Sequence, residues 1–259
     1  MKRSAFLILT AALALTSACN NTQEAEIYPI QDNVEPRLMP RALFADAPDS
    51  LIAELGLEDG IPASVCAFLV KTDGKEILFD AANGAPDSQL LPALDSHAVA
   101  PEDIDHIFIT HLHGDHIGGL VNDESAVFAN ADLQINKIEL DSWLAMPAGQ
   151  TGNLDKVMEA YKGRLHIFTP GDELPCGISA IEAYGHTAGH TMYQIGNIVI
   201  AGDIMHGTAL QQKYPQFNAR FDSDKEMATA SRRSLLEYAS KGGFKVYGMH
   251  FPAPYFIEF

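Results

Sequence analysis

Three imidazoles and one carboxylate fall within six residues of this chain, in the segment His111-Leu112-His113-Gly114-Asp115-His116. The segment follows Ile107-Phe108-Ile109, an apolar run typical of a buried strand. Because side chains alternate along an extended chain, His111 and His113 can point the same way, and Gly114 allows a turn that returns Asp115 and His116 to the same space. Neutral imidazole and carboxylate are ligands of zinc and similar divalent ions. The spacing therefore predicts a metal site rather than a polar loop that is rich in histidine by chance.

This motif resembles the His-x-His-x-Asp-His signature of the metallo-β-lactamase fold superfamily. The later ligands of that family have matches in the expected order, at Gly185-His186-Thr187, Ala201-Gly202-Asp203 and Gly248-Met249-His250, so the resemblance covers about residues 64–250. It implies seven metal ligands in two groups. The first ion is held by His111, His113 and His186, the second by Asp115, His116 and His250, and Asp203 bridges them.

The resemblance implies two divalent ions, with zinc favoured, and a hydrolytic reaction. Two such ions about 3.5–4 Å apart can share a water and lower its pKa toward about 7, and the bridging hydroxide then attacks a carbonyl or phosphoryl centre. Asp115 and His206 are the candidate catalytic residues. His206 stands three residues after Asp203, where several lactonases of the superfamily have tyrosine, and it can donate a hydrogen bond to a substrate oxygen or protonate a leaving alkoxide. A histidine hydrogen-bonded behind the ligands is the equal alternative.

Residue identities separate the chain from several branches of the superfamily. The β-lactamases have cysteine or serine at the position of Asp203, the flavodiiron oxidoreductases have glutamate at that of His113, and the persulfide dioxygenases have cysteine at that of His190. We expect His190, together with Thr110 and Thr187, to orient ligands through hydrogen bonds.

Longer runs of residues resemble the methyl parathion hydrolase-like branch, near the acyl-homoserine lactonases. They favour a dinuclear hydrolase of ester-type substrates, namely small esters, lactones or phosphotriesters. A β-lactamase-type amide hydrolase, an iron-dependent oxidoreductase on the same fold and a non-catalytic metal-binding lipoprotein remain as alternatives. The runs are Ile107–Thr110, Gly185–Tyr193, Gly202–His206, Phe221–Asp224 and His250–Pro252.

The first 18 residues predict a secretory signal. Lys2 and Arg3 precede the apolar run Ala5–Leu15, which is too short to span a bilayer, and Thr16-Ser17-Ala18 stand before Cys19. Small residues before a cysteine resemble the bacterial lipobox, so we expect an exported, periplasmic protein anchored to the membrane through a lipidated Cys19. Ordinary cleavage after Ala18, which would give a soluble periplasmic protein, is the alternative. Cys66 and Cys176 lie in apolar stretches and are expected to be buried free thiols.

Composition limits the partners. The chain of 259 residues is 47% hydrophobic, enough for one sizeable core, and its formal net charge of −17 becomes −19 when Lys2 and Arg3 leave with the signal. Such a surface repels phosphate backbones, so nucleic acid is not expected as a partner. A small molecule is the expected substrate, and a homodimer remains open.

Strands and helices alternate in two similar halves, which predicts an α/β protein. The resemblance implies the four-layer αββα sandwich, with the metals at the edge between the two sheets. We expect a signal over residues 1–18, a tether and irregular arm over 19–59, and the hydrolase domain over 60–259. Pocket-lining residues are expected at Leu112, Met146–Leu154, Met205 and Gly207–Gln211. The strand Phe244–Tyr247 is expected to be the last, and Ser223-Asp224-Lys225-Glu226 to cap the helix that ends at Gly242-Gly243.

Overall fold

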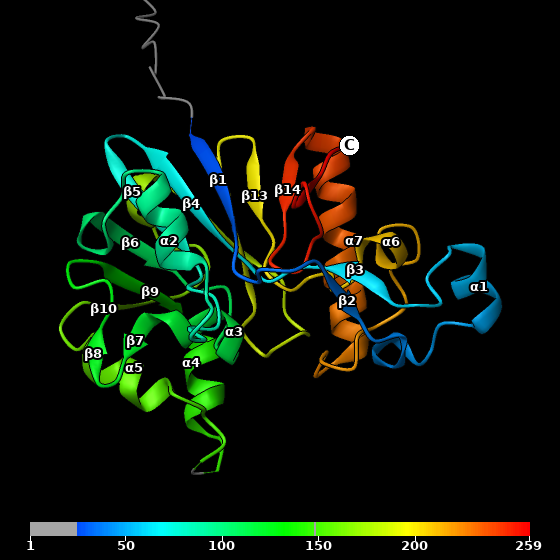
Figure 1. Ribbon diagram of the computed structural model, residues 1–259, viewed down its shortest axis with the longest axis horizontal. Coiled ribbons are helices and arrows are strands. Elements are labelled where there is room, and N and C mark those ends of the chain that lie inside the picture. Colours follow the sequence, from blue (N-terminus) through cyan, green and yellow to red (C-terminus); the bar gives the residue numbers. More distant parts are fainter. Residues whose placement is uncertain (1–24, 148) are drawn as a thin grey trace, which may run out of the picture.

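The computed structural model describes residues 25–147 and 149–259, so the predicted signal and Cys19 lie outside the described residues. Two mixed sheets pack face to face in the centre of the molecule (Figure 1). The first sheet has the order β1-β4-β5-β6-β9-β10, and the second has the order β11-β12-β13-β14-β15. The strands of the first sheet are β1 (Glu26–Gln31), β4 (Cys66–Thr72), β5 (Lys75–Phe79), β6 (Ile104–Phe108), β9 (Asp132–Asn136) and β10 (Leu165–Phe168). Those of the second are β11 (Ser179–Glu182), β12 (Thr191–Ile195), β13 (Ile198–Ile200), β14 (Lys245–Tyr247) and β15 (Phe256–Ile257).

The sequence of the central strands shows why they are buried on both faces. Along β4, Cys66, Phe68 and Val70 face the core between the two sheets, whereas Ala67 and Leu69 face the helices outside. A continuous apolar run is what a strand covered on both faces requires. The Asp73-Gly74 turn that joins β4 to β5 has positive φ at both residues, as a tight two-residue hairpin demands.

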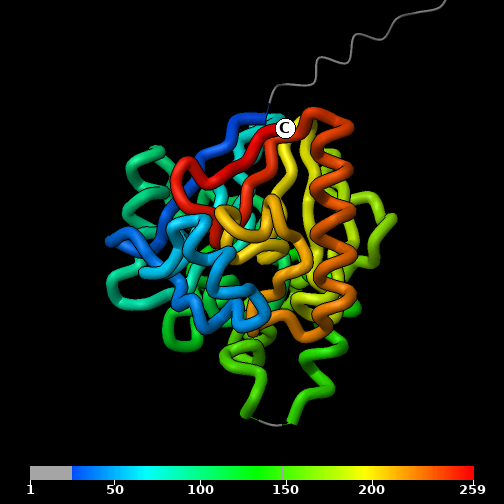
Figure 2. Tube along the Cα trace, turned by 90° about the vertical axis from the view of Figure 1, so that its right-hand side faces the viewer, coloured from blue at the N-terminus to red at the C-terminus, as the bar shows by residue number. Residues whose placement is uncertain are grey.

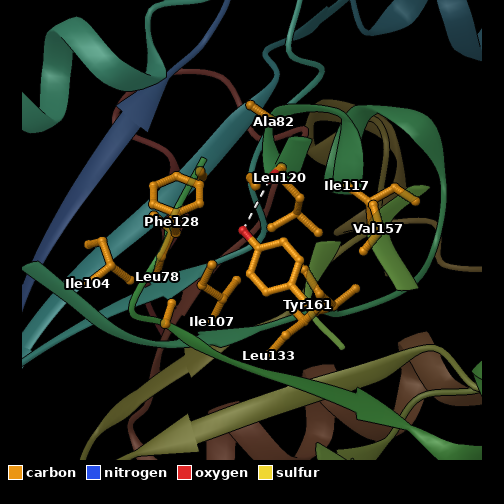
Figure 3. Close-up of a cluster of buried hydrophobic side chains, with 14 of the residues drawn as sticks. Leu78, Ala82, Ile104, Ile107, Ile117, Leu120, Phe128, Leu133, Val157 and Tyr161 are labelled. Atoms are coloured by element: carbon orange, nitrogen blue, oxygen red, sulfur yellow. Dashed lines mark hydrogen bonds between the residues drawn. The ribbon is translucent and has the colours of Figure 1, made fainter. Parts of the chain in front are cut away.

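Helices cover the outer face of each sheet. The helices α2 (Leu90–Ser96), α4 (Lys137–Leu144) and α5 (Leu154–Ala160) pack on the first sheet. Figure 3 shows part of this core, where the Tyr161 hydroxyl donates to the Leu120 carbonyl oxygen over 3.1 Å. The long helix α7 (Lys225–Gly242) covers the second sheet with Leu235 and Ala239 (Figure 2). The predicted αββα order of layers is confirmed.

The segment expected to be an irregular arm is instead structured. β1 pairs with β4 as an edge strand of the first sheet. Its residues Ile27, Pro29 and Gln31 are extended and lie opposite Val70, Phe68 and Cys66 of β4. The hairpin of β2 (Arg37–Met39) and β3 (Ile61–Ala63) then reaches the second half of the molecule, where β3 contacts α6 (Thr208–Gln211) (Figure 1). The segment between the two strands holds the 3-10 turn η1 (Arg41–Phe44) and α1 (Asp49–Glu54).

The segment after His113 folds into short turns. Helix α3 (Gly114–Ile117) is a single turn that starts directly after His113, and Gly114 does not adopt positive φ. The 3-10 turn η3 (Gly118–Leu120) follows, and the β7–β8 hairpin (Val121–Asn122, Ser125–Ala126) ends the segment. Gly118 is needed for close approach, since a Cβ there would lie 2.0 Å from the backbone oxygen of Asn83.

Two further boundaries differ from expectation. β14 is not the last strand, because Phe256–Ile257 returns as β15 and pairs antiparallel with it. Helix α7 is capped by Asp224 rather than Ser223, since the Asp224 carboxylate accepts from the Met227 amide over 2.9 Å. The 3-10 turns η2 (Pro101–Asp103) and η4 (Pro175–Gly177) complete the elements of the described residues. None of the helices within residues 25–147 and 149–259 is both long and apolar enough to cross a membrane.

Candidate metal centre

The seven predicted ligands lie where strands of both sheets end. His111 and His113 follow β6, His186 lies between β11 and β12, Asp203 follows β13, and His250 follows β14. Asp115 and His116 are carried by the single turn of α3, which begins directly after His113. The edges of the two sheets meet here, so residues up to 139 positions apart in the chain are brought into one cluster.

The first predicted group converges on one point. His111 Nε2 lies 2.8 Å from His113 Nδ1, and His186 Nε2 lies 3.2 Å and 3.1 Å from these two atoms. One ligand atom from each of these three residues and from Asp203 lies within 4.8 Å of the others, which is close enough for a single ion.

Asp115, His116 and His250 form the second group, also within 4.8 Å of one another. Asp203 reaches both groups. Its Oδ1 lies 3.2 Å from His116 Nε2, and its Oδ2 lies 3.5 Å from His186 Nε2 and 3.0 Å from His250 Nε2. The structure therefore brings the seven predicted ligands into one cluster, with Asp203 between the two groups.

Hydrogen bonds hold four of the imidazoles with Nε2 directed into the cluster. His116 Nδ1 donates to Asp80 over 2.6 Å, His186 Nδ1 to Asp222 over 3.1 Å, and His250 Nδ1 to the Ser64 carbonyl over 2.8 Å. His111 Nδ1 lies 3.1 Å from Thr110 Oγ1, which in turn donates to Asp80 over 2.7 Å. A donor Nδ1 leaves a lone pair on Nε2, the atom that would bind metal.

A further observation indicates that these residues are suited to hold a metal ion. Within the described part of the chain, His116 Nε2 and Asp203 Oδ1 are buried and have no hydrogen-bond partner, although they lie 3.2 Å apart. Buried polar atoms are rarely left unpaired, and nitrogen and carboxylate oxygen directed at a common centre suit a divalent ion.

Burial and charge set the protonation of the cluster. Burial lowers the pKa of His113 and of His206 to about 4, so both are neutral near pH 7. Burial alone would raise the pKa of Asp203, but the histidines around it, His116 first, outweigh burial and hold it well below its usual range. Neutral imidazole and ionised carboxylate are the forms that bind metal, so His116 and His250, whose pKa the Asp203 carboxylate raises against burial, would have to lose a proton to bind an ion.

The ring nitrogens of His206 and His190 have different partners. Both nitrogens of His190 are engaged, since Nδ1 lies 3.0 Å from the Ala183 carbonyl and Nε2 accepts from the Asp203 amide over 2.9 Å. His190 thus orients the Asp203 backbone, as expected. His206 Nε2 lies 3.2 Å from Asp203 Oδ2, and its ring stacks on that of His250 with centroids 5.0 Å apart. It lines the pocket, although its side chain is almost fully buried.

Sequence reasoning missed four buried groups behind the ligands. Asp80 and Asp222 each hold a ligand histidine, Arg232 donates to Asp222 over 3.0 Å, and Glu139 binds the loops that carry three ligands. Asp80 directly follows β5 and could have been suspected from its position, because the ends of adjacent parallel strands meet. Thr187 donates to Glu139 rather than to a ligand.

The pocket above the cluster was predicted wrongly. Its volume is about 270 Å³, and Leu112 and Met205 are buried in the core beneath instead of lining it. None of the described residues of the predicted segments 146–154 and 207–211 lines it either. The walls come from β2 and from the loop before α7, with Arg37, Met39 and Phe221, and five of the predicted ligands lie at its floor with Gly114 and His206.

Solved structures share this architecture. The fold is similar to that of AbOPH, a hydrolase in the β-lactamase superfamily, with a TM-score of 0.81 and 28% identity over 91% of this chain and 90% of that chain. It is also similar to AidC, a dizinc quorum-quenching lactonase solved with a homoserine product, with a TM-score of 0.79 and 26% identity over 91% of this chain and 90% of that one. Residues 61–122 match the family model of the metallo-β-lactamase superfamily. The chain therefore has the metallo-β-lactamase fold.

Curated members of the superfamily match over a shorter length. Metallo-β-lactamase domain-containing protein 1 of Xenopus laevis is 25% identical over 168 residues, 63% of this chain and 62% of that protein. A ribonuclease Z of Haloferax volcanii is 31% identical over 120 residues, 44% of this chain and 33% of that protein. The chain spans less than two thirds of the length of either relative.

Proposed function

We propose that the protein is a dinuclear metal-dependent hydrolase of small ester-type substrates, a lactonase or phosphotriesterase-like enzyme that uses zinc. The observation that carries this proposal is the convergence of two ligand groups and the shared Asp203 at the floor of one pocket. The solved neighbours AbOPH and AidC are a hydrolase and a dizinc lactonase, which supports the reaction class.

The residues of the site have different roles in the proposed hydrolysis. Two divalent ions bound there supply a water of lowered pKa and polarise the substrate oxygen. Asp115 and Asp203 provide the negative charge that balances two close cations and hold the two ligand groups in fixed relation. His206 presents Nε2 beside Asp203 Oδ2 at the pocket floor, from where its N–H can donate to the oxygen that departs.

The pocket favours a small and mostly neutral substrate. Its volume of about 270 Å³ suits a single ring or short ester, not a polymer chain. Met39 and Phe221 form apolar walls, and Arg37 can donate to an acceptor oxygen at the mouth. The net charge of −17 opposes binding of RNA despite the similarity to ribonuclease Z.

The test is turnover together with metal content. The purified protein, loaded with zinc, is assayed on lactones, phosphotriesters, aryl esters and β-lactams, beside a His113→Ala variant. We expect two metals per chain in the wild type, hydrolysis of lactones or phosphotriesters, and loss of activity together with the first of the two metals in His113→Ala. Full activity with one metal per chain would contradict a dinuclear enzyme. Oxygen consumption or peroxide turnover with bound iron would instead show an oxidoreductase.

A further inference from the structure

Glu139 is a buried carboxylate on the first turn of α4, without an ion-pair partner in the part of the chain that the structure describes. Its charge is met by four hydrogen-bond donors. Oε1 accepts from the Leu112 amide over 3.0 Å and from Trp143 Nε1 over 2.8 Å. Oε2 accepts from Thr187 Oγ1 over 2.7 Å and from the Gly189 amide over 2.9 Å. These contacts satisfy the two oxygens and explain how the charge is tolerated in the interior.

One oxygen of Glu139 holds the first ligand motif. Leu112 lies between His111 and His113, so a hydrogen bond to its amide fixes the backbone that carries both. The same oxygen orients the Trp143 indole, whose ring meets the His113 ring edge-on with centroids 5.6 Å apart. His113 therefore has both its backbone and its ring position set from Glu139.

The other oxygen holds the loop of the third ligand. Thr187 and Gly189 lie in the loop that continues from His186, and both donate to Oε2. Gly189 must be glycine for this approach, because a Cβ there would lie 2.1 Å from the Glu139 backbone nitrogen. The Asn136 side chain, which caps α4, adds a 3.2 Å hydrogen bond to the Gly189 carbonyl.

We infer that Glu139 is a positioning residue for one metal site only, because it joins the two loops that carry His111, His113 and His186. The second group is held by other contacts, from His116 to Asp80 and from His250 to the Ser64 carbonyl. Loss of the Glu139 carboxylate therefore loosens the first site and leaves the second. This inference rests on the proposed metal centre but does not depend on which substrate is hydrolysed.

The test is a zinc titration of the metal-free protein against a competing chelator, which reads the affinity of each site without any assay of activity. Glu139→Gln keeps the shape of the side chain, but its amide group faces the Gly189 N–H instead of accepting from it. We expect the affinity of one site to fall by about 10–100-fold and that of the other to stay unchanged. Thr187→Val, which removes one of the four donors, should weaken the same site by a smaller factor and tests the contact with little risk to folding.

Two variants that each lack a ligand of one group show which metal site Glu139→Gln weakens. In His116→Ala, where the second group has lost a ligand, adding Glu139→Gln should weaken the remaining site. In His113→Ala, where the first group has lost a ligand, adding Glu139→Gln should leave the zinc affinity of the remaining site unchanged. Leu140→Ala, at the neighbouring buried position of α4, is the matched control that lowers the melting temperature while leaving both affinities.

The outcomes separate this inference from the proposed function. Two zinc sites in the wild type, with both weakened equally or neither weakened by Glu139→Gln, would overturn the positioning role alone. A wild-type protein that binds no zinc would overturn the dinuclear hydrolase, and this inference with it.

Discussion

Asp203 is the residue whose two oxygens reach both ligand groups, 3.2 Å from His116 Nε2 and 3.5 Å from His186 Nε2. Its carboxylate is buried among histidines, which hold its pKa well below the usual range, so it stays ionised. The negative charge then lies between the two candidate ion positions, where it would reduce the repulsion between two cations.

We predict that Asp203→Asn retains about one metal per chain and loses most activity, with partial recovery at high zinc. Asparagine keeps the shape and one oxygen but removes the charge, so the second ion binds more weakly. Metal content and turnover are titrated together in the variant and the wild type. Two bound ions and normal turnover in Asp203→Asn would show that Asp203 is not the bridge.

His206 offers a second prediction at the scale of a single side chain. His206→Leu should bind two metals but lower kcat by about 10²–10³-fold, the usual contribution of one hydrogen bond donated to a developing oxyanion. His206→Gln, which can place an amide N–H near the Nε2 position, should lose less. The measurement is kcat at saturating metal, with metal content as control. Wild-type kcat in His206→Leu would mean that this histidine only packs against His250.

At the scale of elements, α7 connects the second sheet to the loops of the centre through Arg232. This side chain is fully buried, donates to the Ile204 and Pro215 carbonyls over 2.7 Å each, and pairs with Asp222 over 3.0 Å. Asp222 in turn holds His186, and Ile204 directly follows Asp203. Helix α7 thus helps to position two ligands, His186 and Asp203, through the contacts of Arg232.

We predict that Arg232→Met lowers the free energy of unfolding by about 3–5 kcal/mol, because it leaves the Asp222 carboxylate buried and unpaired. The next residue on the helix provides the control, since Arg233 is exposed and Arg233→Met should change stability by less than about 0.5 kcal/mol. Denaturant unfolding of the metal-free proteins measures both. Equal stability of the two variants would count against the role of this ion pair.

At the scale of the whole molecule, the net charge bears on the partners of the protein and the N-terminal leader bears on its location. The chain carries 34 acidic and 17 basic residues, and the acidic excess disfavours polyanionic partners. We propose that the protein is periplasmic and anchored to the membrane through Cys19, on the basis of the leader and the small residues before that cysteine. Cys66 and Cys176 are both free, but only Cys66 is buried, and burial raises its pKa to about 12.

We predict that Cys19→Ser moves the protein from membrane fractions to the soluble periplasm, because it removes the lipid attachment point. Fractionation with immunodetection measures this, and Cys176→Ser is the control that should leave the distribution unchanged. Unchanged membrane association of Cys19→Ser would place the anchor elsewhere.

The amino-acid sequence by itself determined the first ligand motif and the α/β class, whereas the later ligands and the order of the layers came from the family resemblance that the motif carries. Metal binding demands particular residue types, and His111, His113 and His116 are spaced by the local geometry of a strand end and one helical turn. The alternation along β4 likewise needs only the period of an extended strand. Such features depend on near neighbours in the chain, so they could be predicted without knowledge of the fold.

Tertiary structure alone decided what stands behind the ligands and around the pocket. Three of the four donors to Glu139 lie 27 to 50 positions away in the chain, and Asp80 bonds His116 across 36, so local patterns mark neither role. Arg37 and Met39 reach the pocket because β2 pairs with β3, which lies beside the second half of the molecule. These contacts depend on which distant strands meet, and a buried carboxylate looks in sequence like any exposed acidic residue until its hydrogen-bond donors are known.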